Sequence, residues 1–383
     1  MGGAVEIEHI PDPRRCREFI ELPWRVNQAD PDWVPPLRMA VDKLLNRRKY
    51  PFFNHGSAEF FVARRDGEVV GRVAAIENRL HAAKYNDSTG FFGFFECDDD
   101  LAACRALLAK AGEWVRGKGY ARMLGPVNYS LNDECPGVLY EGSNGLPLIL
   151  MSHNPRYYRR LLEDAGMRKS KDLFAYMVTR ATVADDRFQR LMKAVRRRAP
   201  KLDIRPVRLD GKGFRADIKT MLDIFNEAWA QNWGFVEVTP AEVDTIAADL
   251  RPIVRPEITA LASIEGKPVG MIVCVPNINE VLHKIPDGKL FPTGWWTLLN
   301  GLRTVHGFRT MLMGVVHEHR GKGVDALMID HVIQNGAAMG YDYCELSWVL
   351  EDNEPMVSLA DKAGGVLYRK YRLFEANTHD LHA

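Results

Sequence analysis

Apolar and polar residues alternate along two stretches of the chain that each begin with a glycine turn. Residues 67–78 read GEVVGRVAAIEN, and residues 266–277 read GKPVGMIVCVPN. Such alternation predicts a strand with one buried face. Each stretch follows another apolar run, at 58–66 and 258–265. The pattern therefore predicts two hairpins of the same design, one in each half of the chain.

The similarity between the halves continues beyond the hairpins. Each half next has an apolar strand with one glycine, a helical pattern, a strand beginning Gly-Tyr, then an Asn, a short helix and a last strand. The paired segments are 90–97 and 311–316, 101–119 and 325–340, 119–125 and 340–349, and 154–178 and 353–376. Because a shared order indicates internal repetition, we expect an α/β protein with two tandem domains, each a mixed, mostly antiparallel sheet flanked by helices.

The halves join in the basic stretch RFQRLMKAVRRRAPK at residues 187–201. Apolar residues at helical spacing among arginines predict a helix that packs through one stripe and ends at Pro200. A role at a membrane surface or on nucleic acid is the alternative. We expect an N-terminal domain at 1–186, a basic linker helix at 187–202 and a C-terminal domain at 203–383.

Composition narrows the class of protein. Hydrophobic residues make up 46% and charged residues 26% of the chain, as in soluble globular proteins. A net charge of +1 produces no overall electrostatic field that would attract nucleic acid. The six cysteines show no CxxC spacing, which fits a reducing compartment. With no signal-peptide pattern and no long apolar run, we expect a cytoplasmic protein, and peripheral contact with the inner membrane remains an open alternative.

A basic turn with two glycines, RGKG, lies between the apolar run at 311–316 and a helical pattern. A strand that leads through such a turn into a helix presents unpaired backbone N–H groups, which favour a bound anion. Gly321 and Gly323 permit close approach of a ligand, and Arg320 and Lys322 add positive charge. Basic turns before helices are common. On this motif alone, the turn is either a phosphate-binding site or an ordinary solvent-exposed turn.

The order of elements around this turn resembles the GCN5-related N-acetyltransferase (GNAT) superfamily, and RGKGVD (320–325) is similar to its pyrophosphate loop. The resemblance implies acyl-CoA as a co-substrate, with no permanently bound cofactor. It also implies that the pantetheine lies between two splayed strands. The residues expected to bind acyl-CoA are Val315, Val316, Arg320, Gly321, Lys322, Gly323, Val324, Asp325 and Asn353.

Asp325 departs from the family pattern, because a carboxylate repels a pyrophosphate. Either its side chain turns away and accepts from backbone amides of its own first turn, or the turn does not hold a pyrophosphate. In the first half, the acidic residues 98–100 stand where the loop would be. The sequence thus predicts one acyl-CoA site, in the second half, and a first half that shapes the acceptor pocket. Protein N-myristoyltransferases are similar in being tandem domains of this kind.

Three segments are candidates for the acceptor side. The loop 125–142 is either a ligand loop or an Asx-rich surface loop, and the turn within 225–240 either lines the acceptor or belongs to the core. The insertion 289–308 either holds a long acyl chain, worth about 0.8 kcal/mol for each buried CH₂, or packs against the other half. The residues expected to bind substrate are Asn128, Asn132, Asp133, Asn232, Trp233, Phe235 and Trp295.

Amide formation from a thioester needs a base for the amine and a proton donor for the thiolate. His317, Glu345 and Tyr368 are the candidates. The superfamily commonly has a tyrosine donor in the short helix after the Asn, and residues 353–365 contain none. His317 and His319 lack a third ligand nearby in sequence, so we expect no metal.

Four longer phrases resemble the bacterial ceramide synthases and their relatives: GPVNYSLNDECPG, NPRYYRRLLEDAGMRKSKDLFAY, NEAWAQNWGF and FPTGWW…RGKGVDALMID. This resemblance implies a bacterial enzyme of sphingolipid biosynthesis that moves a long acyl group from acyl-CoA to a sphingoid base. Two alternatives remain open. One is an N-acetyltransferase acting on a small amine or peptide, and the other is a non-catalytic acyl-CoA binding or sensing protein.

Overall fold

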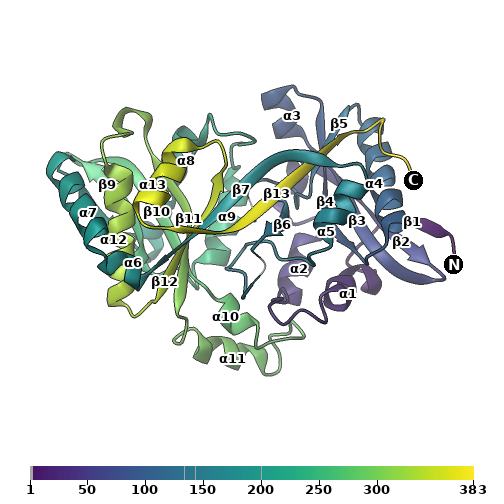
Figure 1. The fold of residues 1–383 in the computed structure, drawn as a ribbon, viewed down its shortest axis with the longest axis horizontal. Helices are drawn as coiled ribbons and strands as arrows, with labels where there is room; N and C mark the ends of the chain where they lie inside the picture. The colour runs from purple at the N-terminus through teal and green to yellow at the C-terminus, as the bar shows by residue number, and fades with distance from the viewer. Residues whose placement is uncertain (1–2, 133, 143, 200) are drawn as a thin grey trace. The chain divides into compact units, whose positions relative to one another are not determined.

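The computed structural model describes residues 3–132, 134–142, 144–199 and 201–383 (Figure 1). The chain forms two compact units, and neither is one continuous stretch. Unit 1 contains the residues up to Asp172 together with Val281–Leu299 and Arg369–Ala383. Unit 2 contains Leu173–Glu280 and Asn300–Tyr368.

Unit 1 has a mostly antiparallel sheet with helices on its faces. Helix α4 packs along β1 to β5, and α1 contacts β3 and β4. Its strands are β1 (Val5–Ile10), β2 (Gly56–Arg65), β3 (Glu68–Asn78), β4 (Thr89–Cys97), β5 (Arg122–Gly125) and β6 (Val138–Glu141). Its helices are α1 (Arg17–Val26), α2 (Arg38–Leu44), η1 (Pro51–Asn54), α3 (Arg79–Tyr85), α4 (Leu101–Gly117) and α5 (Tyr158–Asp164).

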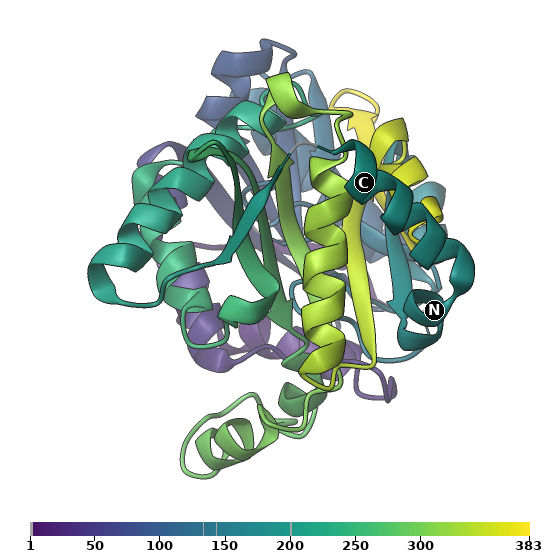
Figure 2. The ribbon, with the colours of Figure 1, turned by 90° about the vertical axis from the view of Figure 1, so that its left-hand side faces the viewer.

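Unit 2 repeats this plan. Figure 2 shows α12 lying across one face of its sheet, and α8 packs on β10 and β11. Its strands are β8 (Asp203–Pro206), β9 (Thr259–Ile264), β10 (Lys267–Pro276), β11 (Gly307–Val315) and β12 (Tyr343–Leu350). Its helices are α6 (Arg180–Ala184), α7 (Asp186–Arg198), α8 (Gly211–Trp229), α9 (Pro240–Leu250), η2 (Pro256–Ile258), η3 (His317–His319), α12 (Val324–Ala338) and α13 (Glu354–Lys362). The expected fold class is confirmed.

Four elements cross the division between the units. Strand β7 (Arg168–Thr179) begins in unit 1, and its later residues pair with β12 in unit 2. Strand β13 (Val366–Asn377) begins in unit 2, and its later residues pair with β5 and β6 in unit 1. Helix α10 (Asn279–Leu282) also crosses, as does α11 (Gly294–Gly301). The last strand of each sequence repeat therefore supplies residues to the other unit's sheet.

Each repeat contains a short parallel pairing of two strands. Strands β4 and β5 pair only over Thr89–Phe91, and β11 and β12 pair only over Gly307–Thr310. Each pair of strands then parts, while β11 stays paired to β10 as far as Val315. Both repeats therefore contain a splay, a place where two parallel strands separate beyond their short pairing. The residues around each splay determine what that repeat can bind.

Helix α7 forms in the basic join that was predicted to be helical. Phe188 and Met192 are buried against Ala363, and Val195 packs beside Ala326 and Leu327 of α12. Its arginines at 196–198 are exposed. The apolar stripe thus packs on the body of unit 2, as expected for a solvated helix. No helix in the described part of the chain has the length and hydrophobicity that a bilayer crossing needs.

Candidate active site

The turn predicted to bind pyrophosphate lies in unit 2, between β11 and α12. Gly321 has φ +70° and Gly323 has φ +84°, a left-handed conformation that glycine adopts without strain. Gly323 is the N-cap of α12 and has no side chain with which to cap it. The N-cap residue therefore offers no side-chain acceptor to the first N–H groups of α12, which have no acceptor within the helix backbone.

Arg320 fixes the turn rather than projecting from it. Its Nε donates to the carbonyl of Val315 at 3.3 Å, and its guanidinium also donates to the carbonyl of Ala228 at the end of α8. The N–H of His317 donates to the Glu227 carboxylate at 3.1 Å. These bonds hold the entry of the turn against α8, whereas the Lys322 side chain is exposed.

Asp325 uses its carboxylate within its own helical turn. The N–H of Ala326 donates to Asp325 Oδ1 at 2.9 Å. Sequence reasoning included this kind of bond as one of two alternatives, because a carboxylate in a first helical turn can accept from backbone amides there. The Asp325 carboxylate is thereby the acceptor for one of the N–H groups at the start of α12.

The corresponding position in unit 1 is closed by ion pairs. Asp100 caps α4 by accepting the N–H of Ala103 at 3.1 Å, and it pairs with Arg65. Asp98 pairs with Arg25 at 3.0 Å, and Asp99 pairs with Arg160. Since the Asp100 side chain occupies the start of α4, the two repeats present opposite chemistry at equivalent helix ends.

Glu345 and Tyr368, two of the predicted catalytic residues, are in contact in unit 2. The Tyr368 hydroxyl donates to one carboxylate oxygen of Glu345, and the Ser347 hydroxyl donates to the other. Arg309 Nε lies 2.8 Å from Ser347 Oγ and 3.7 Å from Glu345 Oε1. Glu345 is fully buried, whereas Tyr368 is half-buried. A buried carboxylate therefore accepts the hydrogen bond of a tyrosine hydroxyl and fixes the orientation of that hydroxyl.

His317 and Asn353 lie at other positions in unit 2. His317 is an exposed residue of η3, and no hydrogen bond links it to Glu345 or Tyr368 among the described residues. Asn353 caps α13, because its side chain accepts the N–H of Met356 at 3.4 Å. Within the described ranges, no group of three His, Cys, Asp or Glu side chains could hold a metal ion.

Asn128, predicted to bind substrate, instead fills the splay of unit 1. Its Oδ1 accepts the N–H of Phe94 at 2.6 Å, and its amide donates to the Glu134 carboxylate. A Cβ on Gly93 would lie 2.1 Å from the carbonyl of Val127, so the 127–128 backbone runs directly against β4. Burial raises the pKa of Glu134, and the bond from Asn128 opposes this only in part.

The other predicted substrate residues are dispersed. Phe235 is buried, with its ring centroid 5.3 Å from that of Phe225, so it belongs to the core of unit 2. Asn232 and Trp233 are half-buried in the turn after α8. Trp295 in α11 is exposed, and Asn132 in the loop after β5 is half-buried. Asp133 lies outside the described residues.

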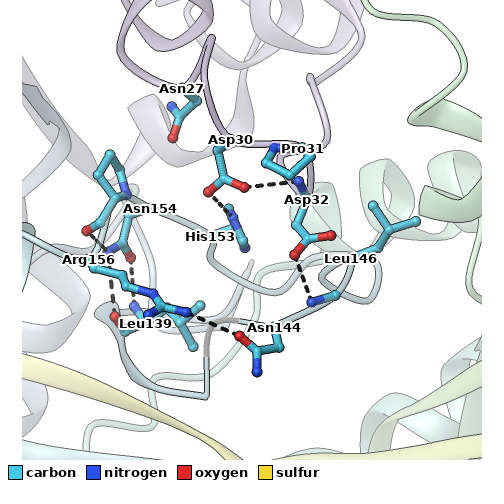
Figure 3. A network of polar contacts seen from close by, with 12 residues as sticks. Asn27, Asp30, Pro31, Asp32, Leu139, Asn144, Leu146, His153, Asn154 and Arg156 are labelled. Atoms are coloured by element: carbon cyan, nitrogen blue, oxygen red, sulfur yellow. Dashed lines mark hydrogen bonds and ion pairs between the residues drawn. The ribbon is translucent and has the colours of Figure 1, made fainter.

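A polar network in unit 1 fastens the loop around residues 139–156 (Figure 3). His153 Nε2 lies 2.8 Å from Asp30, and Asp32 accepts the N–H of Gly145 at 2.8 Å. The side-chain amide oxygen of Asn144 (Oδ1) accepts from Arg156 at 3.1 Å. The Nδ1 atom of His153 is buried and has no hydrogen-bond partner among the described residues. Asp30 thus orients an imidazole whose second nitrogen is enclosed by the protein.

A surface cavity of about 280 Å³ adjoins this network, and no predicted substrate residue in the described part of the chain lines it. The lining residues are Leu139, Tyr140, Glu141, Gly142, Asn144, Asn154, Arg156 and Arg159.

Sequence reasoning missed Arg309, Ser347 and the pairing of His153 with Asp30. Arg309 and Ser347 are 38 positions apart, and Asp30 and His153 are 123 positions apart. These residues form no motif of characteristic spacing along the chain that would have identified them. Ser347 could have been found from its strand, because it has the same side-chain orientation expected for Glu345 at a period of two.

Comparison with known proteins gives relatives along the whole chain. "Bacterial ceramide synthase" of Caulobacter vibrioides (strain NA1000 / CB15N) is 34% identical over 381 residues, covering 98% of each chain. "Protein YghO" of Escherichia coli (strain K12) is 33% identical over 367 residues, covering 94% of this chain and 92% of its own. No family model matches the chain.

Solved structures share the fold at low sequence identity. A tandem GNAT protein from the clavulanic acid biosynthesis pathway aligns with a TM-score of 0.54 at 14% identity, covering 98% of each chain. A GCN5-related N-acetyltransferase from Sphaerobacter thermophilus aligns with a TM-score of 0.52 at 14% identity, covering 98% of this chain and 96% of its own. Both repeats of the chain are thus covered by alignments with GNAT folds.

Proposed function

We propose, from the premise that the chain belongs to the bacterial ceramide synthase family, that it joins a long-chain acyl group to the primary amine of a sphingoid base. The product is a ceramide-type amide. The chain is an acyl-CoA-dependent N-acyltransferase, and the name of the Caulobacter relative, bacterial ceramide synthase, supports this choice of acceptor. The long donor chain and the acceptor are the proposed part.

The observation that carries the proposal is the contrast between the two helix ends. In unit 2, α12 begins at Gly323, which has no side-chain cap, whereas in unit 1 α4 begins at Asp100, whose carboxylate covers its own amides. An anionic pyrophosphate is favoured at the first and repelled at the second. We assign acyl-CoA to the α12 end, with the residues predicted around it: Val315, Val316, Arg320, Gly321, Lys322, Gly323, Val324, Asp325 and Asn353.

Proton transfer is assigned to His317, Glu345 and Tyr368. The amine nitrogen attacks the thioester carbon, loses a proton, and the C–S bond breaks as the thiolate leaves and is protonated. The contact between Tyr368 and Glu345 supports a role for the hydroxyl in moving one of these protons. His317 is exposed in the turn next to the proposed donor site and is the proposed base.

The functional division of the chain follows the sequence repeat. We propose that residues 1–186 shape the acceptor side, 187–202 link the halves, and 203–383 hold acyl-CoA. Asn132, Asp133, Asn232, Trp233 and Trp295 remain proposed acceptor contacts. Asn128 and Phe235, also predicted to bind substrate, make contacts within their own units. Peripheral contact with a membrane, where a long-chain amine would reside, completes the proposal.

The direct test combines the purified protein with acyl-CoA and sphinganine and follows both products. We expect thiol release and a new amide by mass spectrometry with palmitoyl-CoA, and little with acetyl-CoA. Amide formed only from acetyl-CoA and a small amine would favour an N-acetyltransferase. Binding of palmitoyl-CoA without thiol release for any amine would indicate a sensor.

A further inference from the structure

The segment at the start of α11 carries a concentration of exposed large apolar side chains. Phe291 is 75% exposed, Trp295 40%, Trp296 61% and Leu299 57%. Elsewhere among the described residues, large exposed apolar side chains are isolated or adjacent in pairs, as with Met39 and with Val366 and Leu367. Four within nine positions form a patch, and a patch of this kind indicates a partner rather than ordinary surface.

The patch sits on a base that is fixed within unit 1. The carbonyl of Gly288 accepts the N–H of Arg38 at 2.9 Å, and the carbonyl of Pro286 accepts from Trp24 Nε1 at 3.0 Å. His283 is held by the carbonyl of Pro31 at 2.8 Å. The apolar side chains are therefore presented by a segment anchored to α1 and α2, seen in green in Figure 1.

The turn above this base is closed by its own bonds. The N–H of Trp295 donates to the carbonyl of Leu290 at 2.7 Å, and Trp295 Nε1 donates to the carbonyl of Pro292 at 2.8 Å. A Cβ on Gly294 would lie 2.2 Å from the carbonyl of Lys289, so only glycine permits this turn. Because its backbone groups are partly satisfied internally, the turn can enter a less polar medium at reduced cost.

Charge and residue type select the partner. From Lys284 to His306 the chain has three basic residues, Lys284, Lys289 and Arg303, and one acidic residue, Asp287. The Asp287 carboxylate already accepts the N–H of Lys289 at 3.0 Å. Tryptophans with neighbouring apolar and cationic side chains are typical of segments at the boundary between lipid headgroups and acyl chains.

We infer that residues 289–299 dock unit 1 on an anionic lipid bilayer, with Phe291, Trp296 and Leu299 entering the headgroup region. This inference rests on the proposed function, because a bilayer is where a sphingoid base would be found. It differs from the expected acyl-chain site, because side chains this exposed do not enclose a chain.

The test is cosedimentation of the full-length protein with vesicles of phosphatidylcholine and phosphatidylglycerol in a 7:3 ratio. We expect the variant F291S/W296S/L299S to lose about tenfold or more in partition coefficient. The matched control M39S removes an equally exposed apolar side chain from α2 and should leave binding unchanged. Pure phosphatidylcholine vesicles should bind less of the wild type.

Three results would overturn the inference: no vesicle binding by the wild type, equal binding by the triple variant, or a triple variant whose oligomeric mass changes while vesicle binding does not. The last would identify the patch as a contact between two copies of the chain. A separate assay measures acyl transfer without vesicles, on short-chain substrates that dissolve in water. It distinguishes failure of the docking inference from failure of the proposed function. Loss of vesicle binding with transfer retained supports docking, and absent transfer with vesicle binding retained rejects only the proposed reaction.

Discussion

Asn128 joins two parts of unit 1 that the chain order separates. Its Oδ1 accepts the N–H of Phe94 at 2.6 Å, and its amide nitrogen donates to Glu134. Phe94 lies in β4 with φ +50°, beyond the last residue that β4 pairs with β5. One side chain thus satisfies a strand N–H beyond the point where β4 and β5 part.

Replacing Asn128 by Leu should destabilise the protein by about 1–3 kcal/mol, because the substitution leaves a backbone donor and a half-buried carboxyl without their partner. Urea unfolding, followed by tryptophan fluorescence, measures the loss. The control Q28L changes an exposed residue of the same unit and should stay within about 0.5 kcal/mol. Equal stability of N128L and wild type would mean that the bond to Phe94 contributes nothing.

The raised pKa of Glu134 leads us to expect that the free energy of unfolding depends on pH. Its pKa is raised in the folded protein by burial, so it keeps its proton above the pH at which the unfolded chain releases it. Its contribution is therefore fully present below about pH 4.3 and is lost as the pH rises through the folded pKa. Because Gln cannot ionise, E134Q should gain stability relative to wild type from pH 4.5 to pH 8. The expected gain is about 1.4 kcal/mol for each unit of pKa shift. A difference between the two proteins that does not vary with pH would contradict a raised pKa.

Gly323 and Gly340 allow a matched test of the acyl-CoA loop. They flank the two ends of α12, with φ +84° and +96°. Valine at either position should cost about 1–2 kcal/mol through backbone strain, and at Gly323 a Cβ would also lie 2.9 Å from Val195. Only G323V should weaken acyl-CoA binding, by about tenfold or more, as measured by titration calorimetry. Full affinity in folded G323V would mean that pyrophosphate binds elsewhere.

Tyr368 and Glu345 should matter for the rate more than for binding. Removing either group of the pair, as in Y368F or E345Q, should lower kcat by about 10²–10⁴-fold while KM for acyl-CoA changes little. Y343F, on the same strand as Glu345, removes a hydroxyl that donates to Glu280 and serves as the control. If Y368F kept the wild-type kcat, its hydroxyl would have only a structural role, and an E345Q defect would then reflect the buried pairing with Arg309.

Sequence reasoning predicted the hairpins, the repeat and the helix in the join, because strand alternation and helical spacing are local properties. It also included, as one of two alternatives, that Asp325 would bond within its own helical turn. It could not anticipate that Asn128 would plug unit 1 or that Arg320 would bind carbonyls of Val315 and Ala228, because these bonds join residues brought together only by folding. An exposed asparagine and a buried one look the same in a sequence.

The sequence by itself determined the order of elements in each repeat and the presence of one basic and one acidic turn at equivalent helix starts. Tertiary structure alone decided that β7 and β13 each finish in the other unit's sheet, since the alternation within a strand does not specify which edge it will pair with. It also decided that Glu345 meets Tyr368, because strand register and not sequence distance brings two side chains within hydrogen-bonding reach. Local periodicity follows directly from the order of residues. The sheet edge with which a strand pairs, and the partners of buried polar groups, depend on the packing of the whole chain.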